Sequence, residues 1–284
     1  MNLIPITFAL ATAFFWILGE VLGKLVLSEL NATTFNMIGF SSAAIVLTPI
    51  VLFVGLGPTD ALQVILAVTY GTFGLFAAFQ IYFYTMKRSH AHIVACVGNS
   101  APVWTLLFAP LLIGEKITML LVLSLGLVVI GSIFFIQPKK ERSKWKWAVP
   151  LSLAVAALWG CNMVIQKSAI NSGMSLLGFL WISVVSAAVL FSLTGIVTRS
   201  WRSSRFTMRN LRICVVSIIS SRFVGAIFYL SALGMENVSA LAPFISATIP
   251  FAFVLSVLIV REKPTKRALI GTILIFIGLI VAAI

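Results

Sequence analysis

Long apolar stretches follow one another along almost the whole chain, separated by short polar breaks. A helix needs about 20 apolar residues to cross the hydrocarbon core of a bilayer, which is roughly 30 Å thick. Stretches of this kind recur ten times, at 3–27, 32–55, 62–85, 91–112, 117–136, 147–170, 175–197, 211–233, 238–260 and 266–284. Because lipid offers the backbone no hydrogen bonds, the pattern predicts an all-α integral membrane protein with ten transmembrane helices.

The two halves of the chain carry matching residues, which predicts an internal repeat. The pairs are Trp16 with Trp159 and Lys24 with Lys167 at a shift of 143, and Tyr82 with Tyr229 and GEKIT (114–118) with REKPT (261–265) at a shift of 147. Each half holds five predicted helices, an odd number, so the second half must enter the membrane in the opposite orientation. We therefore expect two inverted five-helix repeats, residues 1–137 and 138–284.

Lysine and arginine gather on one side of the predicted bundle. Sixteen of the 20 lie in loops after odd-numbered helices or at their edges, whereas loops after even-numbered helices hold only Lys116. The remaining three, Lys24, Lys167 and Arg222, lie within predicted helices. Basic loops stay on the cytoplasmic side of a membrane. The bias predicts a multi-pass protein of the cell (inner or plasma) membrane, with cytoplasmic basic loops and both termini outside.

Composition narrows the classes of function. The chain is 61% hydrophobic and 10% charged, with a mean hydropathy of +1.13, against roughly 45–50% and 25% in soluble domains. The net charge of +13 would suggest nucleic-acid binding in a soluble protein, but here it resides in membrane loops. The expected partners are the lipid bilayer and a small-molecule substrate, not nucleic acid. Cys96, Cys161 and Cys214 lie in apolar runs without the spacing of a metal site, so no metal or cofactor is expected.

Two related stretches point to a family. WILGEVLGK (16–24) and WGCNMVIQK (159–167) resemble the W-G-x-N-F…K pattern of ten-helix EamA-type transporters in the drug/metabolite transporter superfamily. Each half also has a tyrosine segment followed by an A-x-x-P…GE-like helix, at 84–116 and 229–263. The resemblance spans the chain and implies a transporter of small organic metabolites, often an exporter. The sequence departs from the pattern at Gly19, where the family often has Asn, and its predicted outer termini differ from those of many members.

Polar residues inside apolar helices predict a central cavity. A charged residue at the bilayer centre costs about 3 kcal/mol on insertion scales. Trp16, Glu20 and Lys24 share one face of the first helix because they are spaced four residues apart. A similar stripe on the sixth helix contains Trp159, Asn162 and Gln166. We expect the two stripes to face each other across a cavity, with simple packing of the tryptophans as the alternative.

Arg222 stands in the middle of the eighth predicted helix, and its role is open between two readings. It could form an ion pair with Glu20 that holds the bundle together. It could instead bind a substrate carboxylate or phosphate, which guanidinium recognises in bidentate fashion. The two readings are compatible if the substrate displaces Glu20.

Prolines interrupt the fourth and ninth predicted helices at nearly equal depth. They are Pro102, preceded by Asn99, and Pro250. Interrupted helices in corresponding positions of two repeats point to a transporter's binding site, although proline kinks are also tolerated without a ligand. Tyr82 and Tyr229 are repeat mates and complete the candidate cavity residues.

The leading prediction is a secondary transporter that works by alternating access. An exporter or exchanger of amino acids, aromatic ones included, or of related carboxylates fits Arg222. A multidrug or organic-cation exporter is the alternative, using Glu20 and the central tryptophans through ion pairing and cation–π contact. A proton is the candidate coupling ion. An intramembrane enzyme is a remote alternative, since no H-E-x-x-H or G-x-S-x-G motif is present.

Overall fold

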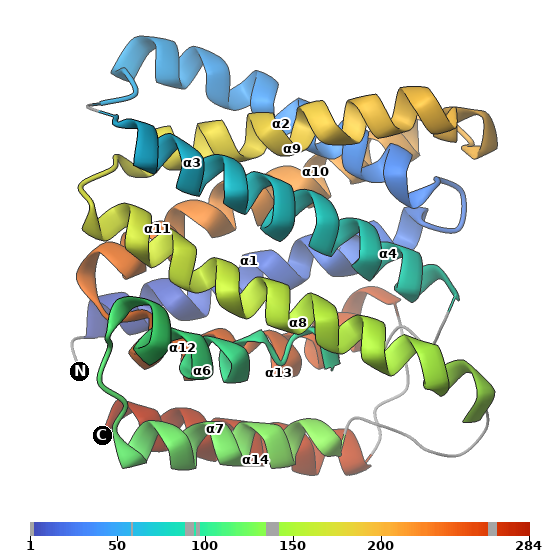
Figure 1. The fold of residues 1–284 in the computed structure, drawn as a ribbon. Helices are drawn as coiled ribbons and strands as arrows, with labels where there is room; N and C mark the ends of the chain where they lie inside the picture. Colours follow the sequence, from blue (N-terminus) through green and yellow to red (C-terminus); the bar gives the residue numbers. More distant parts are fainter. Residues whose placement is uncertain (1–2, 58, 89–93, 95–96, 135–141, 261–265) are drawn as a thin grey trace.

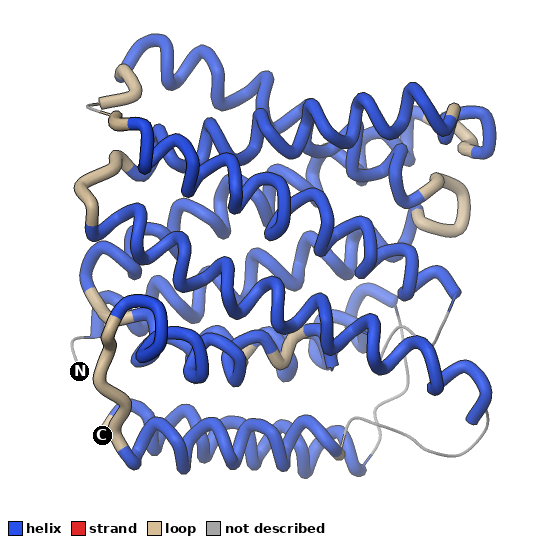
Figure 2. The backbone as a smooth tube through the Cα atoms, viewed as in Figure 1, coloured by secondary structure: helices blue, strands red, loops and turns tan. Residues whose placement is uncertain are grey.

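Helices form all the regular structure in the computed structural model, which describes residues 3–57, 59–88, 94, 97–134, 142–260 and 266–284 (Figure 2). The α-helices are α1 (Leu3–Val26), α2 (Ala32–Val54), α3 (Ala61–Thr69), α4 (Ala78–Arg88), α6 (Ala101–Ile113), α7 (Met119–Ile133), α8 (Arg142–Asn171), α9 (Leu176–Thr198), α10 (Met208–Ile218), α11 (Gly225–Met235), α12 (Val238–Ile245), α13 (Thr248–Leu255) and α14 (Lys266–Ala283). Three π-helical segments, η1 (Tyr70–Ala77), η3 (Ile219–Val224) and η4 (Ser256–Val260), and a 3₁₀ turn, η2 (Ser200–Ser203), complete the order.

Seven helices within the described residues are long and apolar enough to cross a membrane. They are Leu3–Val26, Ala32–Val54, Ala61–Lys87, Trp147–Asn171, Leu176–Thr198, Met208–Met235 and Val238–Ile259. The other three predicted stretches correspond to shorter apolar helices, Ala101–Ile113, Met119–Ile133 and Leu269–Ala283. The first part of the fourth predicted helix lies largely outside the described residues, so its full length is not defined here.

Breaks interrupt several of the uniform helices expected from the apolar pattern, among them the third, eighth and ninth. The third and eighth predicted helices contain the π-segments η1 and η3. The ninth is divided into α12 and α13 by a turn at Ser246 and Ala247. Polar residues occur at two of these places, Arg222 in η3 and Ser246 in the turn, whereas η1 is largely apolar. The hydrophobic pattern alone therefore does not mark the local change in hydrogen bonding.

Short polar caps fix several helix ends. The Asn31 side chain accepts a hydrogen bond from the Thr33 N–H at 3.0 Å and begins α2. Asp60 and Gln63 cap each other's backbone N–H groups at the start of α3. Gly114 ends α6 with φ of 67°, a conformation that glycine adopts without a Cβ penalty. These caps satisfy backbone groups that would otherwise be unpaired near lipid.

The bundle has a helix pair at each edge and the longest helices between them (Figure 1). α2 packs on α9 at one edge, and α7 packs on α14 at the other. In the interior, α1 contacts α10, η3 and α11 as well as α12 and α13, while α8 contacts α3, η1 and α4 as well as α6. Both termini lie at the same end of the bundle (Figure 1).

Glycines let the α7–α14 pair approach closely, and they do so reciprocally. A Cβ at Gly131 on α7 would lie 2.8 Å from the Gly271 carbonyl oxygen. A Cβ at Gly278 on α14 would lie 2.8 Å from the Ser124 carbonyl oxygen. Adding 147 converts 131 into 278 and 124 into 271, so each contact is the repeat mate of the other.

α1 also approaches the helix that carries η3 very closely, and Gly19 makes this possible. A Cβ at Gly19 would overlap the Ser217 carbonyl oxygen and would lie 2.6 Å from Ser221 Cβ. Ser217 Oγ donates a hydrogen bond to the Gly19 carbonyl oxygen at 2.6 Å. The asparagine common in the resembling family at this position would not fit, because the space is filled by α10 and η3.

Large apolar side chains cover the outside of the bundle. Phe53 is 93% exposed, Leu52 81% and Val197 80%. A soluble monomer rarely exposes such a surface, whereas helices surrounded by lipid require it.

Candidate functional site

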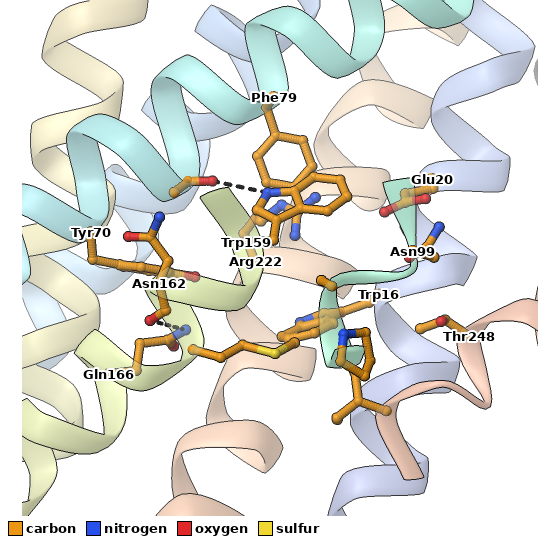
Figure 3. A pocket seen from close by; sticks show the side chains of 15 residues that line it. Trp16, Glu20, Tyr70, Phe79, Asn99, Trp159, Asn162, Gln166, Arg222 and Thr248 are labelled. Atoms are coloured by element: carbon orange, nitrogen blue, oxygen red, sulfur yellow. Dashed lines mark hydrogen bonds between the residues drawn. The ribbon is translucent and has the colours of Figure 1, made fainter. Parts of the chain in front are cut away.

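A narrow cavity of about 50 Å³ lies at the centre of the bundle (Figure 3). It is lined by α1, η1, α4, α8 and η3, by the end of α12 and by the starts of α6 and α13. Eight predicted site residues line it: Trp16, Glu20, Asn99, Pro102, Trp159, Asn162, Gln166 and Arg222. The structure thus brings together residues that are as much as 206 positions apart in sequence, from both halves of the chain.

Arg222 is a buried cation that packs on an aromatic ring and interacts electrostatically with Glu20. Its side chain is 8% exposed, and its guanidinium Cζ lies 3.6 Å from the centre of the Phe79 ring. Its Nε has no hydrogen-bond partner. A cation–π contact contributes about 0.5–2 kcal/mol, less than the several kcal/mol that burying an ion costs. The site is therefore suited to an anionic group.

Glu20 is held by hydrogen bonds on the opposite side of Arg222 from the amides of α8 (Figure 3). The Tyr82 hydroxyl donates to Glu20 Oε2 at 2.8 Å, and Glu20 is 7% exposed. The Asn99 side chain lies beside the same carboxylate (Figure 3). Tyr82 does not line the cavity itself but reaches it through Glu20.

Aromatic rings form rigid walls around these polar groups. The Trp159 ring centre lies 5.0 Å from that of Phe79 and 5.1 Å from that of Tyr82. Its Nε1–H donates to the Gly74 carbonyl oxygen at 3.1 Å (Figure 3). Trp16 packs on Tyr229 with ring centres 5.1 Å apart. Tyr229 lies behind Trp16, away from the cavity lining.

Asn162 and Gln166 supply amide groups from one face of α8. Asn162 Nδ2 donates to the Leu158 carbonyl oxygen at 2.6 Å, while its Oδ1 is buried without a partner. Gln166 Nε2 lies 3.4 Å from the Asn162 carbonyl oxygen. Both side chains are at least 96% buried, so they belong to the interior of the bundle and not to its lipid face.

The two prolines each stand in the first turn of a helix that follows a break. Pro102 is the second residue of α6, after the turn at Asn99 and Ser100. Pro250 is the third residue of α13, after the turn at 246–247. A first-turn proline sacrifices no intrahelical hydrogen bond. Pro102 lines the cavity, whereas beside Pro250 it is Thr248 that does so.

Comparison with known proteins decides the family. The model of the EamA-like transporter family matches the chain twice, at residues 3–137 and 146–284. The chain belongs to the EamA-like transporter family. An uncharacterized transporter of Clostridium kluyveri is 28% identical to it over 291 residues, covering 96% of this chain and 91% of that protein. A protein of known crystal structure shares the fold, with a TM-score of 0.77 at 17% identity over 99% of this chain and 97% of that one.

Membership of this family explains the apolar outer surface and the central position of the polar residues around Arg222. As an EamA-like transporter, the protein is a multi-pass membrane protein, and its relative is also described as a transporter. Charged residues inside membrane helices almost always face the bundle interior, and the cluster around Arg222 does so.

Several residues that line the cavity of this EamA-like transporter were not predicted from the sequence. Phe79 packs on Arg222 and Tyr70 faces the amides of α8. The other lining residues that were not predicted are Gly74, Ala101, Met163, Ile245 and Thr248. Phe79 lies three residues before Tyr82 on the same helix face, so that spacing could have indicated it. The others carry no signal in an apolar chain.

The end of the EamA-like bundle that holds the termini is closed by a clasp, which we define as Glu115 and Lys167. Glu115 accepts hydrogen bonds from the Val238 N–H at 3.0 Å and the Ser239 N–H at 2.9 Å, at the start of α12. Lys167 Nζ donates to the carbonyl oxygens of Leu233 at 2.6 Å and Glu236 at 2.9 Å. The clasp ties α6 and α8 to the turn between α11 and α12. Lys167 is thus engaged outside the cavity.

Proposed function

We propose that the protein is a secondary transporter that moves a small organic metabolite by alternating access. It has ten transmembrane helices in two inverted five-helix repeats, residues 1–137 and 138–284. The two family matches and the reciprocal glycine contacts of α7 and α14 support this arrangement. So does the interior packing, in which α1 and α8 contact corresponding helices of the opposite half. A cavity between two such halves is the usual place for a transporter's substrate.

The substrate class is an amino acid, aromatic ones included, or a related carboxylate that is exported or exchanged. The observation that carries this proposal is Arg222, a buried guanidinium that lines the cavity and whose Nε has no hydrogen-bond partner. A planar guanidinium binds a carboxylate through two parallel hydrogen bonds. The aromatic walls around it suit an apolar side chain.

The small size of the cavity supports a transport cycle in which the surrounding helices move. Its volume of about 50 Å³ holds only a few water molecules, whereas ligand pockets usually measure roughly 300–1,000 Å³. Helices must therefore separate to admit an amino acid. The clasp closes one end of the bundle and is a contact that such a movement would break.

An organic cation is the second candidate substrate, because Glu20 and the aromatic rings could hold one by ion pairing and cation–π contact. Two observations count against it. Glu20 already accepts a hydrogen bond from Tyr82. Arg222 lines the same cavity and would repel a cation where the low dielectric strengthens the repulsion.

Counterflow in proteoliposomes tests the proposed function. Vesicles loaded with the 20 proteinogenic amino acids, one at a time, are expected to take up the matching labelled amino acid without any ionic current. Vesicles loaded with organic cations are the comparison. Exchange of cations alone would support the second candidate, and a current without exchange would indicate a channel.

The basic loops predict the orientation of the chain. A reporter that works only in the cytoplasm, fused after Ile284, is expected to be inactive, because the termini lie outside. The same reporter inserted in the basic loop 198–210 is expected to be active and serves as the control. Activity at Ile284 would reverse the orientation but would leave the helix count intact.

Glu20 is the candidate site for a coupling proton, since it is a buried carboxylate in the cavity wall. Glu20→Gln keeps the shape and removes the titratable group, so transport is expected to lose its dependence on an imposed pH gradient. Tyr82→Phe is the matched control, because it removes the hydrogen bond to Glu20 but leaves the carboxylate. Unchanged gradient dependence in Glu20→Gln would show that no proton moves through this residue.

A further inference from the structure

The carbonyl oxygen of Asn162 is an unused acceptor in the cavity wall. Asn162 is 2% exposed, and its Oδ1 is buried without a hydrogen-bond partner. Its Nδ2 is committed to the Leu158 carbonyl oxygen at 2.6 Å. That bond also fixes the orientation of the amide, because the flipped amide would place two oxygens against each other. The free end of the side chain is therefore an acceptor.

The surrounding backbone leaves room for this amide. A Cβ at Gly74 would lie 2.8 Å from Asn162 Cγ, so only glycine at that position accommodates the side chain as it stands. The same glycine accepts the hydrogen bond of Trp159 through its carbonyl oxygen. Two cavity residues of α8 are thus positioned against one glycine of η1.

The cavity offers opposite polarities on the two sides of its midpoint. Arg222 presents only donors, and Asn162 presents a free acceptor on the side away from Glu20 (Figure 3). A carboxylate satisfies the first and would be repelled by the second. An ammonium group has three donors and no acceptor, so it satisfies Asn162 and would be repelled by Arg222.

We infer that Asn162 recognises the ammonium group of a zwitterionic substrate whose carboxylate is bound by Arg222. This inference rests on the proposed function and narrows its substrate class to free α-amino acids. An acid without an amino group leaves Oδ1 unpaired and is rejected by about 10- to 100-fold, the range expected for one hydrogen bond to a charged group. Asn162 is therefore a specificity-determining residue, and Arg222 alone does not distinguish the two ligands.

The test compares three probes of one shape: phenylalanine, 3-phenylpropionate, which lacks the amino group, and phenethylamine, which lacks the carboxylate. Apparent affinities are measured by competition in proteoliposome counterflow. Asn162→Leu is expected to lower the apparent affinity for phenylalanine by about 10- to 100-fold. The affinity for 3-phenylpropionate is expected to stay unchanged or to rise. Asn162→Asp is expected to retain phenylalanine binding, because a carboxylate also accepts hydrogen bonds from an ammonium group.

Ser152→Ala is the matched control. Ser152 lies on the same helix and also has a buried oxygen without a partner, but it is not in the cavity wall. The apparent affinities for all three probes are expected to stay unchanged in this variant.

Equal losses of affinity for phenylalanine and 3-phenylpropionate in Asn162→Leu would overturn the inference while leaving Arg222 as the carboxylate site. Retained binding of 3-phenylpropionate shows that the variant is folded. A parent protein that binds phenethylamine and neither acid would overturn the inference and the proposed substrate class together.

Discussion

Arg222→Ala is expected to lower the affinity for carboxylate substrates by about 10- to 200-fold. This loss corresponds to a charge-assisted hydrogen bond worth about 1.5–3 kcal/mol. A decarboxylated amine of the same shape is expected to bind equally well or better, because the variant removes a buried positive charge from the cavity. The physical reason is that Arg222 Nε has no hydrogen-bond partner while Glu20 is already engaged by Tyr82, so a substrate carboxylate supplies the acceptor.

Arg222→Lys is expected to restore binding only in part. An ammonium group lacks the planar fork that binds both carboxylate oxygens, and it stacks less well on Phe79. Arg212→Ala is the control, since Arg212 lies on the same predicted transmembrane helix but is exposed. If acid and amine lose affinity equally in the Arg222 variants, the arginine is structural and the cation hypothesis centred on Glu20 takes its place.

Gly19→Ala is expected to lower the stability of the bundle by about 1–3 kcal/mol, the usual cost of overpacking a close contact. The added Cβ meets the Ser217 carbonyl oxygen and the side chain of Ser221, neither of which can move without shifting the helix. The midpoint of thermal unfolding in detergent and the folded yield from size-exclusion chromatography measure the effect.

Gly126→Ala is the matched control, because nothing lies within 4 Å of a Cβ built at that position of α7. It is expected to be neutral or slightly stabilising, since alanine favours helix over glycine. Equal stability of the two variants would mean that α1 does not approach η3 as closely as the structure places it.

The sequence was informative where polarity conflicts with lipid. Glu20, Asn162 and Arg222 could be selected because each would be costly in a lipid-facing position, and all three line one cavity. The family assignment from the two tryptophan stretches is confirmed. The all-helical fold class is confirmed for the described residues, and seven of the predicted spans appear there as full-length candidates.

The rest could not be read from the sequence for physical reasons. Tyr70 stands among many apolar and aromatic residues, so its pattern does not differ from that of a lipid-facing side chain, and Phe79 is marked only by its spacing from Tyr82. The relation between Glu20 and Arg222 could not be read from the sequence either. Glu20 accepts a hydrogen bond from Tyr82 and interacts electrostatically with Arg222. Whether two buried charges meet depends on the rotation of their helices, and a π-segment changes that rotation without changing composition.

The π-segments give insertions and deletions an unusual consequence in this protein. A π-segment accommodates one residue more than α-helical hydrogen bonding would, and one residue corresponds to about 100° of rotation. Because the wide turn absorbs that residue locally, deleting one residue from η3 would restore a regular helix and would keep Tyr229 facing Trp16. The same change in a regular α-helix would instead rotate every residue that follows it. Diverging relatives could therefore lose or gain one residue at η1 or η3 and still keep the same set of cavity residues.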